Sequence, residues 1–512
     1  MAVSEPTGLV DQHDNALEDA RATDHTGLLG LHPGVWWVAA AFALVEVAVG
    51  ARYGFHRDEL YFVVAGRHPA LGYVDQPPLA PLVTRVATLL FGTSPSAVRI
   101  VPALAGGGVV LGTALIARLL GGRGVAQVLA ALAIACAPIT LAAAHLANTT
   151  VYDILAWTTA VAAILLAVRH GHPKAWLAAG VAVGLGLENK DLLLLLVVSA
   201  AVGVLAAGPR RVFLDRWLWA GAAVAVALWA PNLVWQAMHH WPELAMSRAL
   251  RAQHSAGGDY LTVLPAQFIY LGLAAAPLAV VGVRRLIRDR SVRFLAIATA
   301  LVALFVVVDV PGRPYYTDGL LPLVFAVGAV VVEQRAESFR AARRWLLAPL
   351  VGLAVTIPVI LPVLPQAALA HIGGIHKLNY DLTETIGWPQ LTAQVLAVYD
   401  HLSPDQRNQS AIFTNNYGEA SALVVYGAHR LPPVLSGHNS VWMWGPGRAP
   451  DGTVITVGAA DQLAPHFGTC SPAAIFHSPH DVPNDENGVQ ISICTHPLGP
   501  WSSFWNQVRH YD

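Results

Sequence analysis

The chain has 512 residues, of which 55% are hydrophobic and only 12% are charged, about half the charged share of a typical soluble domain. This composition excludes an ordinary soluble enzyme and indicates a polytopic membrane protein. The net charge of −1, with no block of like charge, provides no attraction for nucleic acid, so no nucleic-acid partner is expected.

The N-terminal segment, residues 1–33, is polar and acidic. Its charged residues include Asp11, Asp14, Glu18, Asp19 and Asp24, opposed by Arg21. It lacks the basic start of a signal peptide and has no long apolar stretch. We therefore expect a disordered cytoplasmic tail before the first span.

Residues 34–365 contain apolar runs long enough to cross a bilayer core of about 30 Å. Eleven transmembrane helices are predicted, at 34–51, 97–119, 124–144, 151–168, 175–188, 191–207, 217–236, 261–283, 294–310, 319–333 and 345–365. The fifth run is short, and the fifth and sixth can be misread as one.

Basic residues alternate with these spans. With a cytoplasmic N-terminus, the inner loops carry Arg118, Arg123, Arg169, Lys174, Arg210, Arg211, Arg216, Arg284, Arg285, Arg288, Arg290, Arg293, Arg335, Arg340, Arg343 and Arg344. The short outer loops carry only Lys190, Arg248, Arg251 and Arg313. Because positive charge favours the cytoplasmic side, we expect a multi-pass protein of the cytoplasmic membrane with its C-terminus outside.

The first outer loop, residues 52–96, is predicted to contain two helices lying in the membrane interface. Leu60–Ala65 and Leu79–Phe91 are apolar with polar interruptions, as expected of interfacial helices. They flank Gly72–Pro78, which ends in a stiff diproline.

Charged residues gather in this loop ahead of each helix. They are His56-Arg57-Asp58-Glu59 and Asp75, which is followed by Gln76. Charge at a membrane boundary is costly unless it faces water, protein or a ligand, which makes function the default interpretation. A simple pair of Arg57 with Glu59 or Asp75 at the headgroups is an equally good explanation of the cluster.

From residue 366 to 512, apolar runs shorten and turn residues multiply, indicating a separate exported domain. Strands are expected at Ala411–Thr414, Val454–Val457, Ala473–Phe476 and Val489–Ile493, and a helix at Glu419–Tyr426. The predicted fold class is thus an α-helical polytopic membrane protein with a small exported α/β domain.

The three cysteines do not have the spacing of metal ligands. Cys136 lies in an apolar run, whereas Cys470 and Cys494 lie in the C-terminal domain. Two free buried thiols are the simplest reading, but export would permit a disulfide. We expect no required cofactor; a divalent metal is compatible with the sequence, but no motif supports one.

The predicted topology brings unusual polar residues to the outer face. They are His56, Arg57, Asp58, Glu59, Asp75 and Gln76 in the first loop, His145, Asn148 and Asp153 near the third and fourth spans, Lys190 after the fifth, and Arg313, Tyr315 and Tyr316 after the ninth. Convergence of acids, amides and cations from distant segments predicts a site.

Asp58 is the candidate general base, because a carboxylate can take the proton of an attacking hydroxyl. Glu59 would orient it. Lys190 and Arg313 are candidates for binding a lipid-linked phosphate, whose oxygens favour charged donors.

Simpler roles stay open for several of these residues. Lys190 can pair with Glu188 or Asp191. Tyr315 and Tyr316 fit an interfacial aromatic belt, His145 can cap a span, and Asp153 can be a structural acid bonded to Asn148 or Thr149.

The arrangement resembles the membrane glycosyltransferases of the protein O-mannosyltransferase and aminoarabinose-transferase group, with the GT-C fold. The resemblance covers nearly the whole chain and rests on Asp58-Glu59, Gln76-Pro77-Pro78-Leu79, Lys190, Arg313 to Tyr316, and Leu321-Pro322. Tyr417-Gly418-Glu419-Ala420, Gly437-His438-Asn439-Ser440 and Trp444-Gly445-Pro446 also resemble bacterial members with an exported domain.

This resemblance implies transfer of a sugar from a polyprenyl-phosphate donor to a protein, lipid or envelope glycan on the outer face, with inversion and with Asp58 as base. We assign donor binding to Arg57, Gln76, Lys190, Arg313 and Tyr316, and a substrate pocket to His56, Asp75, His145, Asn148, Asp153 and Tyr315. Many relatives have Lys or His where this chain has Gln76. An amide cannot neutralise phosphate, so charge must come from Arg57, Lys190 or Arg313.

Two other functions are compatible with a helical chain of this kind. Many helices with intramembrane polar groups also describe an ion-coupled transporter. A non-catalytic partner in envelope assembly would have the same helices. Acids clustered in an outer loop and a bulky exported domain argue against the transporter, and the intact Asp58-Glu59 pair argues against the non-catalytic partner.

Overall fold

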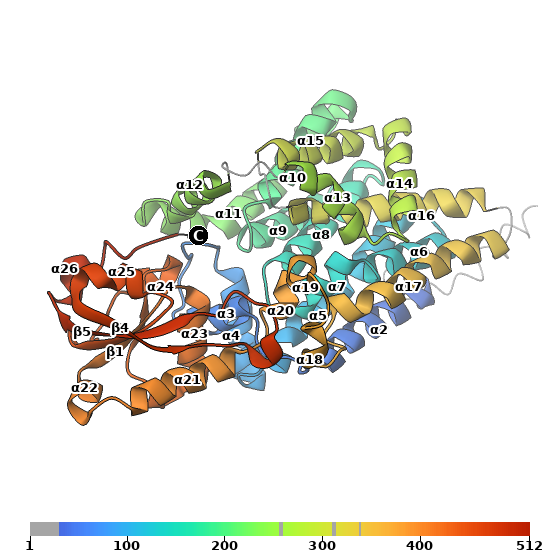
Figure 1. The fold of residues 1–512 in the computed structure, drawn as a ribbon. Coiled ribbons are helices and arrows are strands. Elements are labelled where there is room, and N and C mark those ends of the chain that lie inside the picture. The colour runs from blue at the N-terminus through green and yellow to red at the C-terminus, as the bar shows by residue number, and fades with distance from the viewer. Residues whose placement is uncertain (1–29, 255–259, 310–313, 337–338, 512) are drawn as a thin grey trace, which may run out of the picture.

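The computed structural model describes residues 30–254, 260–309, 314–336 and 339–511. A bundle of helices forms one part of the molecule and a five-stranded sheet with short helices forms the other (Figure 1). Five helical segments of the described chain are long and apolar enough to cross a membrane, or six if one bent pair counts as a span. The chain is therefore a mostly helical multi-span membrane protein.

The five segments are α5 (Pro95–Leu119), α8 (Thr150–Val168), α11 (Arg216–Met238), Tyr315–Arg335 with α16 (Leu321–Arg335), and Ala341–Ile360 in α17 (Phe339–Ile360). The bent pair is α6 (Gly124–Ala135) and α7 (Pro138–His145). The other helices of the bundle are α2 (Pro33–Val49), α9 (Ala175–Leu187), α10 (Leu193–Ala207), α13 (Tyr260–Leu271), α14 (Ala276–Arg288) and α15 (Arg293–Asp309).

Helices occupy all eleven predicted ranges, but two ranges are broken. In 124–144 the axis bends by 61° before Pro138, where a proline nitrogen cannot continue the hydrogen-bond ladder. In 261–283 the helix ends at Gly272, whose φ of +77° suits glycine. The fifth and sixth ranges are separate helices, α9 and α10.

Small residues let the membrane helices approach closely. A Cβ added to Gly180 would lie 2.1 Å from the carbonyl oxygen of Gly221, and one added to Gly221 would lie 2.1 Å from that of Trp176. Backbone contact of this kind drives helix association in lipid, where apolar side chains gain little from contacting each other.

The first loop forms α3 (Arg57–Ala65) and α4 (Leu79–Phe91), at the positions expected. However, α3 is buried on all its faces from Glu59 to Ala65, whereas an interfacial helix would leave one side to lipid. Many of the neighbours that bury it, including residues of α23, come from the C-terminal part of the chain.

The sheet has the order β2-β1-β3-β5-β4. Its strands are β1 (Ser410–Thr414), β2 (Val434–Ser436), β3 (Thr453–Val457), β4 (Phe467–Ile475) and β5 (Gln490–Pro497). The first three are parallel, whereas β5 is antiparallel to β3 and β4. Four strands were predicted; β2 was not, because three residues do not establish an alternating pattern.

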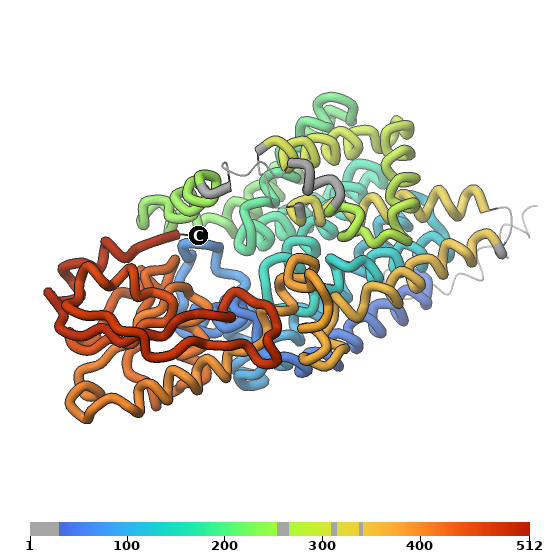
Figure 2. Tube along the Cα trace, viewed as in Figure 1, coloured from blue at the N-terminus to red at the C-terminus, as the bar shows by residue number. Residues whose placement is uncertain are grey.

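Alternate residues of β1 face two apolar layers, as a strand requires. Ile412 packs in one apolar layer with residues of α21 (Trp388–Asp400) and α23 (Tyr417–Gly427). This layer also contains Phe55, Leu60 and Val63 of the first loop. Phe413 faces the other layer, with α26 (Trp501–Phe504). Figure 2 shows the first loop, in blue, against the C-terminal segments, in orange and red. The first loop is thus part of the C-terminal domain's core.

The remaining described helices are short or lie outside the bundle. They are α12 (Pro242–His254), α18 (Gln366–Leu369), α19 (Ile375–Leu378), α20 (Tyr380–Thr383), α22 (Pro404–Asn408), α24 (Asn439–Met443) and α25 (Ala460–Leu463), with 3-10 turns at Arg210–Leu214, Pro314–Leu320, Ala428–Arg430, Ala464–His466 and Pro479–Asp481. Cys470 of β4 and Cys494 of β5 form a disulfide, and Cys136 is a buried free thiol.

Candidate functional site

The start of α3 holds Asp58 at the second position of the helix. The Nδ1 atom of His56, the residue before the helix, accepts a hydrogen bond from Asp58 N at 3.1 Å, and Glu59 Oε2 accepts one from His56 N at 2.8 Å. This reciprocal capping satisfies amides that a helix start otherwise leaves unpaired. A carboxylate at this position is also stabilised by the helix dipole.

The Asp58 carboxylate is bonded by the C-terminal domain. The Tyr417 hydroxyl donates to its Oδ1 at 2.8 Å, while Arg57 Nε and His56 Nδ1 lie 3.8 Å from its two oxygens. Burial, and then the Asp58 charge, raise the pKa of Tyr417 well above its usual value, so Tyr417 stays a donor. Asp58 is 33% exposed, so a substrate can still reach it.

Asp75 lies beside this group on the same side of α3. The Tyr61 hydroxyl donates to Asp75 Oδ1 at 2.8 Å, and Ser440 Oγ donates to the same oxygen at 3.4 Å. Burial raises the pKa of Asp75 to about 6, with the nearby Asp58 adding to the effect. Ser440 also accepts from Val74 N at 2.9 Å, so α24 and the first loop fix this carboxyl together.

Glu59 points away from Asp58 and is bound to Arg99 of α5. Arg99 Nε and Nη2 donate to its two oxygens at 2.9 and 2.7 Å, a bidentate pair with both side chains buried. Arg99 also donates to the carbonyls of Gly50 and Gly54. The sequence offered one signal for this partner, a lone arginine inside an apolar run, and reasoning from the loop alone missed it.

His145 belongs to the same buried network. Its Nδ1 lies 3.1 Å from Glu46 Oε2, and its Nε2 lies 3.4 Å from Arg99 Nη1. It therefore connects α7 to α2 and α5 and lies behind Glu59 rather than beside Asp58.

Lys190, in the turn between α9 and α10, lies over two neighbouring tyrosine rings. Its Nζ is 4.8 Å from the ring centres of both Tyr315 and Tyr316, a cation–π arrangement. Its charge also acts on two buried acids, Asp153 and Asp318. Arg313 lies outside the described residues.

Two candidates near Lys190 have local partners. Asp153 Oδ1 accepts from Trp157 Nε1 at 3.1 Å rather than from Asn148 or Thr149, and Asn148 Oδ1 accepts from Thr150 N at 2.9 Å. Asp318, which the sequence analysis did not single out, is 2% exposed, and neither of its oxygens has a hydrogen-bond partner in the described part of the chain.

Three buried donor atoms of the first loop make no hydrogen bond within the described residues. His56 Nε2, Arg57 Nε and Gln76 Nε2 are buried without a hydrogen-bond partner among the described residues. Arg57 lies over the rings of Tyr380 and Tyr417, at 5.2 and 5.7 Å. The nearest carboxylate oxygens, those of Asp381 and Asp58, lie 3.7 Å from His56 Nε2 and 3.8 Å from Arg57 Nε, which is beyond hydrogen-bond distance. Buried donors without a hydrogen bond are costly, so the start of α3 suits an acceptor such as a phosphate oxygen.

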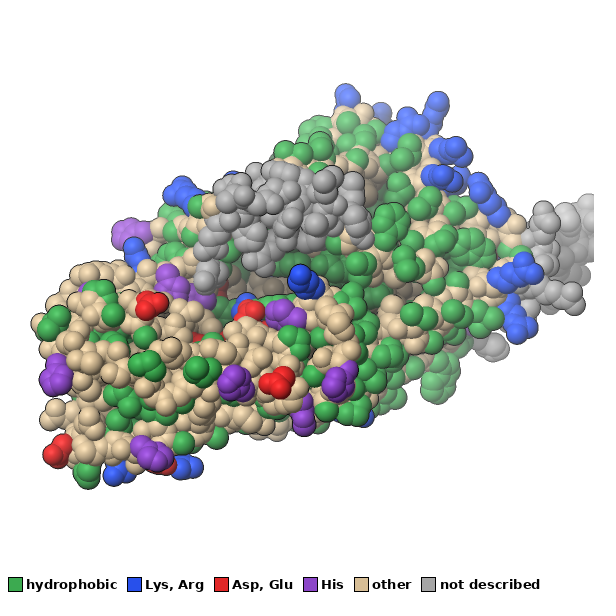
Figure 3. All heavy atoms as spheres, viewed as in Figure 1, with side chains coloured by type: hydrophobic (Ala, Val, Ile, Leu, Met, Phe, Trp, Pro, Cys, Tyr) green, Lys and Arg blue, Asp and Glu red, His purple; other side chains and the backbone are tan. Residues whose placement is uncertain are grey.

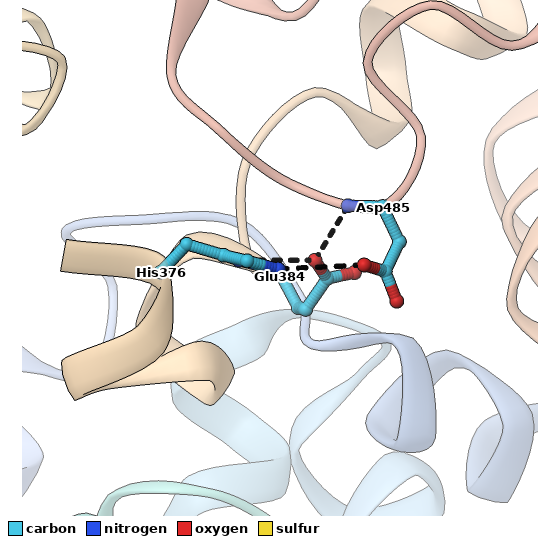
Figure 4. Close-up of side chains that lie close together, drawn as sticks. All are labelled: His376, Glu384 and Asp485. Carbon is cyan, nitrogen blue, oxygen red and sulfur yellow. Dashed lines mark hydrogen bonds and ion pairs between the residues drawn. The ribbon is translucent and has the colours of Figure 1, made fainter. Parts of the chain in front are cut away.

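Arg57 does not pair with Glu59 or Asp75. Its Nη1 lies 3.5 Å from Asp485 Oδ2, in the loop before β5. Asp485 in turn lies beside His376 and Glu384, and these three side chains point toward one another (Figure 4). Within the described residues they are the one group of histidine and acids with the spacing of metal ligands.

Comparison with known proteins is consistent with this architecture. Residues 75–235 match the family model described as dolichyl-phosphate-mannose-protein mannosyltransferase. The solved structure of ArnT from Cupriavidus metallidurans in the apo state is similar with a TM-score of 0.59 and 17% identity, covering 90% of this chain and 98% of that one. The same protein bound to undecaprenyl phosphate gives 0.57 and 18%, covering 91% and 99%. No curated protein matches the chain in sequence.

Proposed function

We propose that this chain, a membrane glycosyltransferase by its match to the mannosyltransferase family, moves a sugar from a polyprenyl-phosphate donor to an acceptor outside the cytoplasmic membrane. The acceptor is a protein, a lipid or an envelope glycan. Asp58 is the proposed general base, and the anomeric centre is inverted.

The observation that carries this proposal is the combination of an accessible carboxylate with buried donors that make no hydrogen bond within the described residues. Asp58 is held by Tyr417 and is 33% exposed, and His56 Nε2 and Arg57 Nε beside it are buried without a hydrogen-bond partner among the described residues. A base and an anion site side by side are what transfer from a sugar phosphate requires.

The proposed reaction combines one proton transfer with an exchange of bonds at the anomeric carbon. The acceptor hydroxyl gives its proton to an Asp58 oxygen as its own oxygen bonds to the anomeric carbon. The bond from that carbon to the phosphate oxygen breaks, and the polyprenyl phosphate leaves with the electron pair. The departing phosphate gains charge, which the Arg57 guanidinium can stabilise through charge-assisted hydrogen bonds.

Lys190 is the second cation proposed for the donor. Its ammonium lies over two tyrosine rings, and its N–H groups can donate hydrogen bonds to phosphate oxygens. Gln76 can donate to a phosphate but adds no charge, so Arg57, Lys190 and Arg313 are the proposed sources of positive charge. The bound undecaprenyl phosphate in the similar ArnT structure supports a lipid phosphate as ligand.

We further propose eleven spans of the GT-C type, with the N-terminus inside and the C-terminal domain outside. Figure 3 supports this orientation, because Lys and Arg side chains gather at the end of the helical part farthest from the sheet. The positive-inside rule places that end in the cytoplasm. A disulfide between Cys470 and Cys494 also suits an oxidising exterior.

The test is donor-dependent transfer by purified protein in detergent. A polyprenyl-phosphate sugar with a labelled sugar, added with envelope extract, should yield labelled acceptor and free polyprenyl phosphate in equal amounts. The same protein in vesicles should not move free sugar across the membrane. Solute movement that needs no lipid-linked sugar would instead support a transporter.

A further inference from the structure

The group formed by His376, Glu384 and Asp485 joins two segments that are distant in sequence. His376 lies in α19 and Glu384 follows α20, whereas Asp485 lies in the loop before β5. This loop is attached to the α20 segment twice, because Asp485 N donates to Glu384 Oε1 at 2.9 Å and Asn484 Nδ2 donates to the Ile386 carbonyl at 2.8 Å.

Glu384 is a buried carboxyl of which only one oxygen accepts a hydrogen bond within the described residues. It is 1% exposed, its Oε1 accepts from the Asp485 amide, and its Oε2 has no hydrogen-bond partner within the described residues. A buried carboxylate oxygen without a partner is costly unless a proton or a cation neutralises it.

The hydrogen bonds of His376 indicate which ring nitrogen is available. The Thr383 hydroxyl donates to the Tyr380 carbonyl at 2.9 Å, so its oxygen accepts from His376 Nδ1, 2.8 Å away. With Nδ1 protonated, the neutral ring has its lone pair on Nε2. Metal-binding histidines are commonly oriented in this way by an acceptor on the other nitrogen.

That lone pair faces another acceptor. His376 Nε2 lies 3.4 Å from Asp485 Oδ1, which is long for a charged hydrogen bond. Two ligands at about 2.1 Å from a tetrahedral ion lie roughly 3.4 Å apart. The other Asp485 oxygen is already bound by the Tyr380 hydroxyl and lies near Arg57, so Oδ1 is left to face the histidine.

Acidic side chains outnumber basic ones around this group. Glu486, next to Asp485, is buried and is hydrogen-bonded to Glu419. The positive charge of Arg57 lies close enough to Asp485, Glu384 and Glu486 to stabilise the charged form of each. Asp485 is 48% exposed, so an ion can enter from solvent and keep a water ligand.

We propose that His376, Glu384 and Asp485 form a binding site for a divalent transition metal, which fastens the C-terminal domain to the segment after α17. One nitrogen and two carboxylate ligands with an open position are typical of zinc and related ions rather than of calcium or magnesium. Through Asp485 the ion also positions Arg57 next to Asp58.

The experiment measures zinc binding by full-length protein in detergent, without an affinity tag. After removal of metal with chelator and reloading, we expect about one Zn²⁺ per chain by elemental analysis. Zn²⁺ should raise the melting temperature, whereas Ca²⁺ and Mg²⁺ should not. A protein that retains no Zn²⁺ and does not change its melting temperature would overturn the proposal without using any variant.

Variants locate the ion. His376→Gln and Glu384→Gln should abolish stoichiometric zinc, and Thr383→Val should weaken it by about 10- to 100-fold, as expected for loss of an orienting partner. His371→Gln, an exposed histidine of the same segment, is the matched control. Equal zinc affinity in wild type and folded His376→Gln would place the ion elsewhere and reject this site. Because the readout is metal content, failure here is distinguishable from failure of the glycosyltransferase assignment.

Discussion

The Tyr417 hydroxyl donates a hydrogen bond of 2.8 Å to Asp58 Oδ1, across 359 residues of sequence. Tyr417 is the first residue of α23 in the C-terminal domain, and Asp58 is the second residue of α3 in the first loop. The carboxylate that we propose as base is thus held by the C-terminal domain. That domain is consequently part of the candidate site and not an appendage to it.

Removing this hydrogen bond should slow transfer. Tyr417→Phe keeps the ring that packs on Tyr61 but removes the hydroxyl that donates to Asp58 Oδ1. A hydrogen bond to a charged group contributes about 1.5–3 kcal/mol, so we expect turnover to fall by roughly ten- to a hundredfold. Steady-state transfer kinetics check this, with Tyr399→Phe as control. Unchanged turnover in Tyr417→Phe would mean that Asp58 is oriented by other groups.

Glu59 should matter for stability more than for chemistry. Glu59→Gln leaves the buried Arg99 guanidinium without its carboxylate, a loss that costs about 3–5 kcal/mol when both groups are buried. We expect a clearly lower melting temperature and a smaller folded fraction, with turnover per folded molecule reduced much less than by Asp58→Asn. A variant with normal melting but little turnover would assign Glu59 a direct role instead.

Asp75 should make stability depend on pH. Its pKa is about 6 in the folded protein, against about 3.9 when unfolded. Between these values the folded state binds more protons, so the contribution of Asp75 to stability falls as pH rises from about 4 to 6. Asp75→Asn does not ionise, and its melting temperature relative to wild type should rise from pH 4 to pH 7. A difference that is independent of pH, like that of the exposed control Asp405→Asn, would contradict this.

Lys190 should contribute to binding of the donor. If its ammonium contacts the phosphate, Lys190→Ala loses about 1.5–3 kcal/mol, and the KM for the polyprenyl-phosphate sugar rises by roughly ten- to a hundredfold. The matched control is Lys174→Ala, whose ammonium also lies over an aromatic ring, that of Trp217, at 5.8 Å. Equal KM values in the two variants would indicate that Lys190 contacts its tyrosine neighbours and does not bind the donor.

Local properties of the sequence were enough to place most helices and strands. The length of one apolar run predicted the helix α8, and a turn followed by another apolar run predicted α23. Both signals depend only on residues that are adjacent in sequence. The bend before Pro138 was missed, since the apolar run continues through it and a proline inside a membrane helix is tolerated.

Partners brought together by folding could not be predicted. The sequence suggested Arg57 as a partner for Glu59, and only the packing of α5 against the first loop reveals that the partner is Arg99. Likewise, a pattern that suits an interfacial helix at α3 does not reveal that the C-terminal core will cover it. Asp485 and His376 carry no recognisable spacing, because their proximity arises from a loop that folds back across 109 residues.

The central claim is most directly tested by Asp58→Asn. The amide keeps the shape of the carboxylate and can still accept from Tyr417, but it cannot take a proton. We expect transfer from a polyprenyl-phosphate sugar to fall by about 10²–10⁴-fold, with melting temperature and donor KM close to wild type and with the exposed control Asp461→Asn fully active. Near-normal transfer by well-folded Asp58→Asn would contradict the account and leave Asp75 or Asp153 as the base to examine.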